Sequence, residues 1–466
     1  MLNSKIKRVI VVGGGLAGMA AAVALESAGV EVTLLEARRT LGGRAGSFED
    51  PQTGEILDNC QHVLLGCCTN LIDFYRRIGA EALIRFHRAI HFRDETGRRF
   101  DLFGVKQFPA PFHLAPALAG FSALTIYERR KLTEAMLEMA QIGREGRQRL
   151  DGTAFGDWLD EQGQPESLVQ KFYDAVVISG LNEDTRRASA KYAIQIFQES
   201  LIANSHGYVV GMPLCPLGEL YRKIPVRDVR FGTRVAEIKF DRDRIAGIEL
   251  ANGETLVADA YVLATNHHAV QKWMPAEMAK TDARFARLDQ FESVPILGVH
   301  LWFDRPVLKE SHAAMMRGPL QWVFRKDEAG NAVHGVISAA REWADRSKDE
   351  MLSLFEKQVR QTFSEARDAK LLRGVVVIEK RATFSPLPRI DRIRPQQSPP
   401  PMGIQNLFLA GDYTQTGWPA TMEGAVRSGY LAADAILQKL SPDHVHQTFL
   451  IDDLPIQWPA RLLGYR

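Results

Sequence analysis

Glycines at three positions near the N-terminus have the spacing that a dinucleotide phosphate requires. The chain contains Gly-Gly-Gly-Leu-Ala-Gly, which matches the pattern G-x-G-x-x-G. Gly13 permits a tight turn, Gly15 lets the backbone approach a pyrophosphate, and Gly18 lets a helix pack against a strand. The amides of Leu16 and Ala17 would then face the phosphates from the first turn of that helix.

The glycine turn is flanked by the strands and the helix that a dinucleotide-binding site needs. A β-branched run, Lys7–Val12, predicts a buried strand, and Ala17–Ser27 predicts a helix. A second strand, Glu31–Leu35, is followed by Glu36, whose carboxylate can accept hydrogen bonds from a ribose diol. A glycine pattern alone is weak, but strand, turn, helix, strand and acid together predict dinucleotide binding.

Two further motifs stand at opposite ends of the chain. Glu36 is followed by Ala-Arg-Arg-Thr-Leu-Gly-Gly-Arg, which ends at Arg44. Near the C-terminus, a predicted strand at Asn406–Ala410 precedes Gly411 and Asp412, and a predicted helix, Ala420–Leu437, follows a short loop. The guanidinium of Arg44 is a fixed cation with forked donors, which suits a diphosphate.

Together these motifs resemble the flavin-containing amine oxidase and phytoene desaturase superfamily. The resemblance implies bound FAD and assigns a set of contacts by position. Glycine and arginine residues of the second motif would support the diphosphate, an aspartate would bind a ribityl hydroxyl, and a helix N-terminus would face the flavin pyrimidine. A Thr-Arg-Val segment would contact adenine through its backbone. The positions that match are Ala37, Arg38, Gly43, Arg44, Val235, Gly411, Asp412, Thr421 and Met422.

Several other stretches resemble one branch of this superfamily, the hydroxysqualene dehydroxylases of squalene and hopanoid biosynthesis. They are Leu57–Gly66, Phe108–Leu114, Leu181–Asp184, Pro216–Leu220 and Trp418–Glu423. Cys60 departs from the glycine that is common in that branch. The resemblance implies that hydroxysqualene loses its hydroxyl and receives a hydride from reduced FAD, giving squalene. An electron donor for the flavin, NADPH or a separate reductase, is then also required.

Protonation of the leaving oxygen requires an acid. Asp58 and His62 follow the Gly-Gly-Arg motif, where the superfamily's chain passes over the flavin, and they are the catalytic candidates, with His62 as the acid and Asp58 as its orienting group. Equally, His62 can be a core histidine and Asp58 a turn residue. Tyr192 and Tyr208 are weaker alternatives.

Composition narrows the class of protein. The 466 residues carry a net charge of +2, which does not favour nucleic acid as a partner. The four cysteines show no CxxC spacing, and no HExxH or G-x-S-x-G motif occurs, so no metal is predicted. Few cysteines favour a reducing, cytoplasmic setting.

The expected fold class is α/β. It comprises a Rossmann-type FAD-binding domain, glutathione-reductase-like and of the amine oxidase and phytoene desaturase type, with an inserted α+β substrate domain. The expected domain limits are 1–85, 225–285 and 396–440 for the discontinuous FAD domain, 86–224 and 286–395 for the substrate domain, and 441–466 for a C-terminal tail.

Two segments leave the relation to a membrane open. Residues 107–127 contain no Asp, Glu, Lys or Arg, but three prolines argue against a spanning helix. They form either a buried part of the substrate domain or a patch that dips into a bilayer. The apolar residues of 451–466 form either a docked terminus or an interfacial tail. Peripheral contact with the inner face of the plasma membrane is an expectation that rests mainly on the insolubility of the polyene substrate.

Three rival functions fit the same motifs. A phytoene or carotenoid desaturase would oxidise a polyene and would need the same FAD site and an apolar pocket. An amine oxidase would enclose its amine between aromatic rings, and Tyr413 and Trp418 do not form a clear pair in the sequence. A non-catalytic FAD-binding scaffold would hold the cofactor without turnover.

Overall fold

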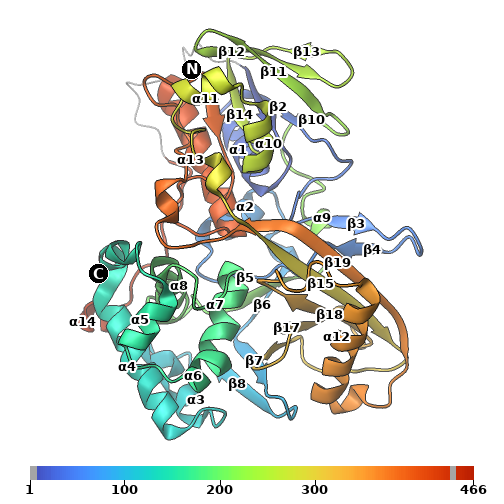
Figure 1. Cartoon of the computed structure of the whole chain (residues 1–466), viewed down its shortest axis with the longest axis vertical. Helices are drawn as coiled ribbons and strands as arrows, with labels where there is room; N and C mark the ends of the chain where they lie inside the picture. The colour runs from blue at the N-terminus through green and yellow to red at the C-terminus, as the bar shows by residue number, and fades with distance from the viewer. Residues whose placement is uncertain (1–7, 441–447, 466) are drawn as a thin grey trace.

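The structure, a computed structural model, describes residues 8–440 and 448–465. Three parts are visible in Figure 1: a parallel-sheet domain at the top, a helical part at the lower left, and a large sheet covered by one helix at the lower right. The α/β class is confirmed.

The parallel-sheet domain draws its strands from three separate stretches of the chain. Its order is β10-β2-β1-β14-β20, with all pairings parallel. The strands are β1 (Arg8–Val12), β2 (Glu31–Leu35), β10 (Asp228–Arg230), β14 (Ala260–Leu263) and β20 (Leu407–Leu409). Strands from residues near 10, 230–260 and 407 thus share one sheet, which is the arrangement expected of a discontinuous domain.

Small side chains set the distance between the two main helices of this domain. Helix α1 (Leu16–Ser27) packs along α13 (Met422–Leu440), and its first ten residues are all buried. A Cβ on Gly429 of α13 would lie 2.3 Å from the carbonyl oxygen of Ala17. Only a glycine allows this backbone approach, so the N-terminal and C-terminal motifs are packed together.

An antiparallel three-stranded sheet extends from the same domain. It contains β11 (Val235–Asp241), β12 (Arg244–Leu250) and β13 (Thr255–Leu256), joined by short turns. The turns fall where Asp241–Arg244 and Asn252-Gly253 predict them, and Arg242 takes a left-handed φ of 54°.

Both predicted insertions contribute to a seven-stranded sheet. Its order is β19-β15-β18-β17-β16-β7-β8. The strands are β7 (Ala89–Arg93), β8 (Arg99–Phe103), β15 (Ser293–Phe303), β16 (His312–Met315), β17 (Trp322–Arg325), β18 (Ala332–Ile337) and β19 (Leu371–Phe384). Helix α12 (Lys348–Thr362) covers one face through Met351, Phe355 and Val359. The opposite face is turned toward the rest of the molecule.

The helical part lies between residues 112 and 202. Its helices are α3 (Ala115–Gly120), α4 (Ile126–Gly146), α5 (Phe155–Glu161), α6 (Glu166–Leu168), α7 (Asp174–Leu181) and α8 (Ala190–Phe197). Phe155, Tyr173 and Phe197 pack ring against ring in its core. The segment Glu166–Ile178, whose apolar spacing is typical of one continuous helix, is interrupted by a π-helical turn, Val169–Tyr173, which that spacing does not reveal.

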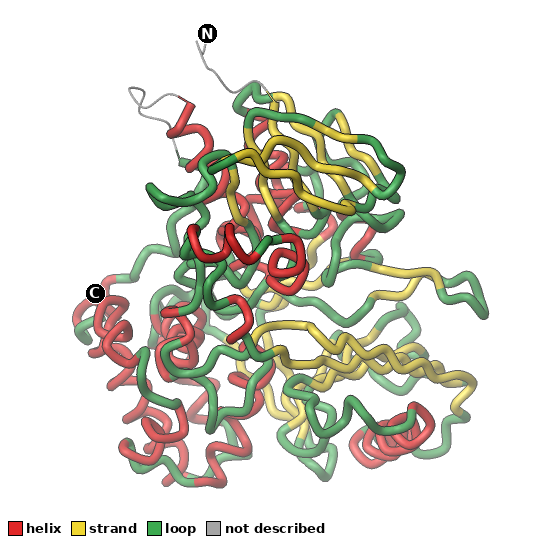
Figure 2. The backbone as a smooth tube through the Cα atoms, turned by 45° about the horizontal axis from the view of Figure 1, so that its top comes forward, coloured by secondary structure: helices red, strands yellow, loops and turns green. Residues whose placement is uncertain are grey.

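Short elements connect the parts. Hairpin β3 (Ser47–Glu49) and β4 (Ile56–Asp58) projects from the side of the molecule (Figure 2). A small sheet joins β5 (Leu64–Leu65), β9 (Val210–Pro213) and β6 (Ile84–His87). Strand β6 crosses the domain limit expected at residue 85. Helices α2 (Thr69–Arg77), α9 (Leu217–Leu220), α10 (His267–Trp273) and α11 (Ala276–Thr281) complete the connections.

The C-terminal segment, residues 448–465, is docked on the helical part. The amide of Gln457 donates to the carbonyl of Ala203 at 2.9 Å, and Asn204 donates to the carbonyl of Pro455. Helix α14 (Trp458–Leu462) ends the chain, yet the side chains of Trp458 and Leu462 are 66% and 77% exposed. Within the two described ranges, no helix is both long and apolar enough to cross a membrane.

Candidate functional site

The three glycines of the first motif differ in what surrounds them. A Cβ on Gly18 would lie 1.9 Å from the carbonyl oxygen of Gly13, and one on Gly13, whose φ is +111°, would lie 2.6 Å from the carbonyl oxygen of Ala264. These two positions are glycine because the turn and the helix pack closely. A Cβ on Gly15 would meet nothing within 4 Å. The open space beside Gly15 is where a pyrophosphate would approach the backbone.

The carboxylate of Glu36 is held in place by backbone amides. Its two oxygens accept from the amides of Gly14 and Arg38, each at 2.7 Å. Each oxygen keeps a lone pair that can accept from a ribose hydroxyl. The amide of Thr233 donates to the carbonyl of Glu36 at 2.9 Å, which brings the segment leading to Val235 beside this acid.

The two glycine motifs lie against each other. The amide of Gly42 donates to the carbonyl of Gly14 at 2.9 Å. A Cβ on Gly43, whose φ is +58°, would lie 3.3 Å from the Cα of Gly15. Ala37 and Arg38 are exposed between them. The backbones of the two motifs therefore form one continuous cradle.

Arg44 and Asp412 are joined directly to each other. The guanidinium donates to both carboxylate oxygens, at 2.9 and 2.7 Å, and also to the carbonyl of Ala382. Burial works to raise the pKa of Asp412, but the charge and hydrogen bonds of Arg44 hold that pKa below its ordinary value. The sequence predicts separate roles at the diphosphate and the ribityl chain. The structure instead brings both side chains to one point as a bidentate pair.

Buried polar atoms without a partner cluster around this pair. Within the described residues, no hydrogen bond reaches Thr265 Oγ1, His267 Nε2, the Tyr413 hydroxyl or Trp418 Nε1. These residues follow β14 and β20, at the carboxyl ends of the parallel strands. Buried polar groups in proteins are nearly always hydrogen-bonded, so atoms left without partners in one region indicate a ligand there. A polar cofactor at this edge of the sheet fits the residues present.

The last motif forms the start of α13. The hydroxyl of Thr421 accepts from the amide of Gly424 at 3.1 Å, as an N-capping residue does, and Met422 begins the helix. The amide of Gly411 donates to Ser428 Oγ at 2.7 Å, which fixes the preceding loop to the same helix. The positive end of the helix dipole lies in this turn and would favour negative charge on a reduced flavin.

The predicted pairing of Asp58 with His62 is not present. The Asp58 carboxylate accepts from Ser47 Oγ at 2.7 Å, from the amide of Leu217 at 2.8 Å, and from Lys326 Nζ at 3.2 Å. It joins the β3–β4 hairpin, α9 and the loop after β17. His62 Nδ1 lies 3.0 Å from the carbonyl of Cys60 instead. An orienting role for Asp58 is therefore replaced by a structural one.

The surroundings of His62 favour its neutral ring. Burial lowers the pKa of His62, and the hydrogen bond to Cys60 offsets this only in part. A carbonyl oxygen can only accept, so Nδ1 carries the hydrogen and Nε2 keeps its lone pair. The catalytic role predicted for His62 stays a prediction; the hydrogen bond to Cys60 leaves the lone pair of Nε2 free.

Two further histidines lie behind this segment and were missed from the sequence. His300 on β15 pairs with His334 on β18, their ring centroids are 4.0 Å apart, and His300 Nε2 lies 3.2 Å from the carbonyl of Asp58. Burial lowers the pKa of His300 to about 4 and that of His334 well below its usual value, so both rings are neutral. Their positions are 34 residues apart, and only the strand register brings them together.

Arg394 is a second residue that the sequence does not single out. Its buried guanidinium donates to the carbonyls of Asp412 and Thr414 and to the hydroxyl of Thr416. These bonds hold the loop between β20 and α13 in one shape. No sequence motif predicts these hydrogen bonds, because a buried arginine that binds backbone carbonyls has no characteristic spacing from its partners in the sequence.

Comparison with known proteins identifies the family. The model of the flavin containing amine oxidoreductases matches residues 16–437, nearly the whole chain. The chain belongs to this family. With the glycine cradle and the unpartnered polar atoms around Arg44 and Asp412, this establishes an FAD-binding oxidoreductase.

Curated relatives match over similar lengths. A 15-cis-phytoene desaturase of chloroplasts and chromoplasts from an Oncidium hybrid cultivar is 29% identical, covering 92% of this chain and 78% of the relative. A zeta-carotene desaturase from a Synechocystis species is 28% identical, covering 92% of this chain and 97% of the relative. These proteins are what the chain resembles in sequence.

Solved structures share the fold at lower identity. An oxidoreductase from Methanosarcina mazei superposes with a TM-score of 0.70 at 16% identity, covering 92% of this chain and all of the other. Putrescine oxidase bound to putrescine gives a TM-score of 0.68 at 17% identity, covering 92% and 99%. At this identity the likeness shows the fold alone, and the Rossmann-type architecture is confirmed.

Gly15 offers a test that separates cofactor binding from folding. Gly15→Ala adds a methyl group to open space at an ordinary φ of −77°, so the apoprotein should keep its thermal midpoint. FAD binding should weaken at least tenfold, because the methyl group fills the space that the diphosphate needs. The dissociation constant is measured by flavin fluorescence on apoprotein.

Gly120→Ala is the matched control, since a Cβ there also meets nothing within 4 Å. Gly120→Ala should change neither the thermal midpoint of the apoprotein nor the dissociation constant of FAD. Unchanged FAD affinity in Gly15→Ala would contradict the placement of the cofactor beside Gly15.

Proposed function

We propose that this chain is an FAD-dependent oxidoreductase of a linear polyisoprenoid. The observation that carries the proposal is similarity over more than nine-tenths of the chain to desaturases of phytoene and zeta-carotene. Both named substrates are long isoprenoid hydrocarbons. Identities of 28–29% support the class of substrate and leave the individual substrate to experiment.

An apolar cluster next to the flavin cradle supports a hydrocarbon substrate. Asn59 donates to the carbonyls of Gly43 and Arg44, both at 3.4 Å, so the segment that follows it begins at the cradle. That segment meets the inner face of the seven-stranded sheet in a cluster of Cys60, Phe324 and Val336, against which Val63, Met212, Ile296 and Trp322 pack. These apolar side chains suit a polyene, and the histidines beside them, His62, His300 and His334, all have lowered pKa values.

Desaturation is the first candidate reaction, because it is the one that the named relatives carry out. FAD, when bound, supplies an acceptor for two electrons. The substrate loses a hydride to that acceptor and a proton to a base from the neighbouring carbon, and a C=C bond forms between the two carbons. His62 is our candidate for the base, because its neutral ring has a free lone pair at Nε2.

Reductive dehydroxylation of hydroxysqualene is the second candidate. Five sequence stretches, Leu57–Gly66 among them, favour it because they resemble the hydroxysqualene dehydroxylases. The C–O bond breaks, the oxygen leaves as water after gaining a proton, and a hydride from the reduced cofactor takes its place. An electron donor, NADPH or a reductase, must then restore the reduced cofactor. The low pKa of His62 weighs against it as the acid for this reaction.

Two other functions receive less support. Tyr413 packs against His267 and Phe291, while the ring of Trp418 is faced by the guanidinium of Arg427 at 5.0 Å. Each ring is thus packed against other side chains, which disfavours an amine oxidase that would enclose its amine between them. A non-catalytic scaffold would bind FAD and show no turnover, which the following experiment detects.

A two-arm single-turnover experiment under anaerobic conditions tests the proposed function. In one arm, oxidised protein is mixed with phytoene or ζ-carotene, and we expect flavin bleaching matched by a product two mass units lighter. In the other arm, chemically reduced protein is mixed with hydroxysqualene, and flavin reoxidation matched by squalene would assign the second reaction. No change in either arm, with FAD bound and the polyene demonstrably bound, would reject both.

His62 is tested by the pH dependence of the same reaction. As a base it is active when neutral, so the rate of flavin reduction should be constant near pH 7. The rate should fall as the pH drops below the lowered pKa of His62, which lies under 6.5. His62→Gln should lower the rate at least a hundredfold and remove this pH step. A rate that instead rises toward acid pH in the native chain would identify His62 as an acid.

We further propose a cytoplasmic protein that collects its substrate at the inner face of the plasma membrane. Both segments that the sequence singles out carry exposed apolar side chains, and they touch where the amide of Ala110 donates to Gln457 Oε1. The exposed residues are Phe108, Phe112, Ile126, Tyr127, Trp458 and Leu462. Apolar side chains beside each other on a surface favour contact with lipid.

Sedimentation with vesicles of phosphatidylethanolamine and phosphatidylglycerol tests this surface. We expect the native chain to sediment with the vesicles, and Trp458→Ser with Leu462→Ser to reduce the bound fraction at least threefold. The control is Leu372→Ser with Met402→Ser, which removes two equally exposed side chains elsewhere. The proposed surface would be contradicted if both double variants lost the same fraction of vesicle-bound protein. It would also be contradicted if the native chain did not sediment with the vesicles.

A further inference from the structure

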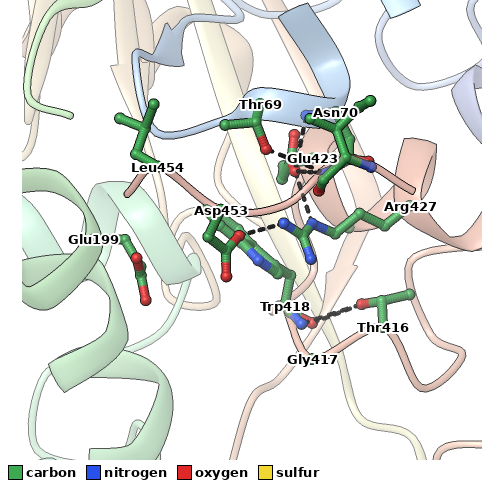
Figure 3. Close-up of polar contacts among 12 residues, drawn as sticks. Thr69, Asn70, Glu199, Thr416, Gly417, Trp418, Glu423, Arg427, Asp453 and Leu454 are labelled. Atoms are coloured by element: carbon green, nitrogen blue, oxygen red, sulfur yellow. Dashed lines mark hydrogen bonds and ion pairs between the residues drawn. The ribbon is translucent and has the colours of Figure 1, made fainter. Parts of the chain in front are cut away.

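A residue of the C-terminal segment reaches the helix that starts at the flavin motif. Asp453 forms an ion pair with Arg427 of α13, one turn from the beginning of that helix (Figure 3). The sequence predicts a C-terminal tail at 441–466, either docked or interfacial, and gives it no role in the site. Its contact with α13 gives it one.

Arg427 lies between two carboxylates. Its Nε donates to Glu423 at 2.7 Å, and its terminal nitrogen donates to Asp453. Glu423 is fully buried and also accepts from the amides of Asn70 and Leu71, at 3.2 and 2.8 Å. These are amides of the first turn of α2, so Glu423 caps that helix from outside.

The same guanidinium touches the loop of the flavin motif. The guanidinium carbon of Arg427, Cζ, lies 5.0 Å from the ring centroid of Trp418, a distance typical of a cation–π contact. Trp418 in turn is held by Thr416, whose hydroxyl accepts from the Trp418 amide at 3.2 Å. Figure 3 shows Asp453, Arg427, Glu423 and Trp418 converging between α2 and α13.

Asp453 is fixed in position from both sides of the molecule. Asn70 of α2 exchanges two hydrogen bonds with the backbone of Ile451, at 2.8 and 2.9 Å. Arg144 of the helical part donates to the carbonyl of Leu454 at 3.0 Å. The residues before and after Asp453 are thus bound to different parts of the fold, which places the backbone of Asp453 beside Arg427.

We propose that Asp453 is a positioning residue of the flavin site, which acts through Arg427 on Trp418 and on the first turn of α13. The proposal rests on the placement of the flavin at that turn. Asp453 adds one negative charge near this turn, beside the carboxylate of Glu423 and the guanidinium groups of Arg427 and Arg144. Negative charge near the turn disfavours the anionic reduced flavin and lowers its reduction potential. Solvent screens this charge only in part, because Glu423 and Arg427 are buried and the side chain of Asp453 is 20% exposed.

The test compares Asp453→Asn with Asp452→Asn. Both remove one negative charge from neighbouring positions of the same segment, but Asp452 is exposed. The flavin midpoint potential and the FAD dissociation constant are measured on holoprotein and apoprotein without any substrate. We expect Asp453→Asn to shift the potential to a more positive value and to weaken binding of oxidised FAD at least threefold. Asp452→Asn should leave both unchanged.

Asp453→Glu separates charge from packing. It keeps the carboxylate. The flavin midpoint potential of Asp453→Glu should therefore differ less from the potential of the native chain than the potential of Asp453→Asn does. Equal potentials in the Asp453→Asn and Asp452→Asn variants, or a more negative potential in Asp453→Asn, would overturn the proposal. Neither measurement uses a polyene, so failure of the proposed substrate would not alter this result.

Discussion

The ion pair between Arg44 and Asp412 joins the first and last functional motifs of the chain. The two residues lie 368 positions apart, yet two hydrogen bonds connect them. For this pair to form, β1 and β20 must share one sheet, and α1 must approach α13 as closely as Gly429 permits. The cofactor cradle therefore exists only when both ends of the chain have folded onto each other.

The segments between the two motifs must fold so that this ion pair can form. Because the parallel-sheet domain is closed by its terminal segments, the inserted stretches must leave it and return, and they meet each other in the seven-stranded sheet. The inner face of that sheet is brought to the cradle by the segment from Asn59 to His62. The site consequently has a polar side that holds FAD and an apolar side that suits a hydrocarbon.

Burial decides the chemistry of the polar groups at this boundary. His62, His300 and His334 all have pKa values below the ordinary range because desolvation disfavours the imidazolium. Neutral rings can accept a proton and do not oppose positive charge that develops on a polyene. Such rings agree with the oxidation that we propose, in which a base takes a proton from carbon.

The local motifs could be predicted from the sequence because each depends on a few neighbouring residues. Gly13, Gly15 and Gly18 have their spacing because of the backbone geometry of a strand, a turn and a helix, and Glu36 follows from the next strand. The turns of β11–β13 fall at the turn residues Asp241–Arg244 and Asn252-Gly253 for the same reason. Family resemblance then added FAD, which the family match confirms.

The contacts that only the tertiary structure decided all join residues far apart in the chain. Asp58 was expected beside His62 but binds Ser47, Leu217 and Lys326, and the register of β15 and β18 brings His300 to His334. Asp453 meets Arg427 because the last segment is fixed by Asn70 and Arg144. A sequence shows which side chains can pair, whereas the choice of partner depends on strand register and on the packing of distant segments, which no local pattern encodes.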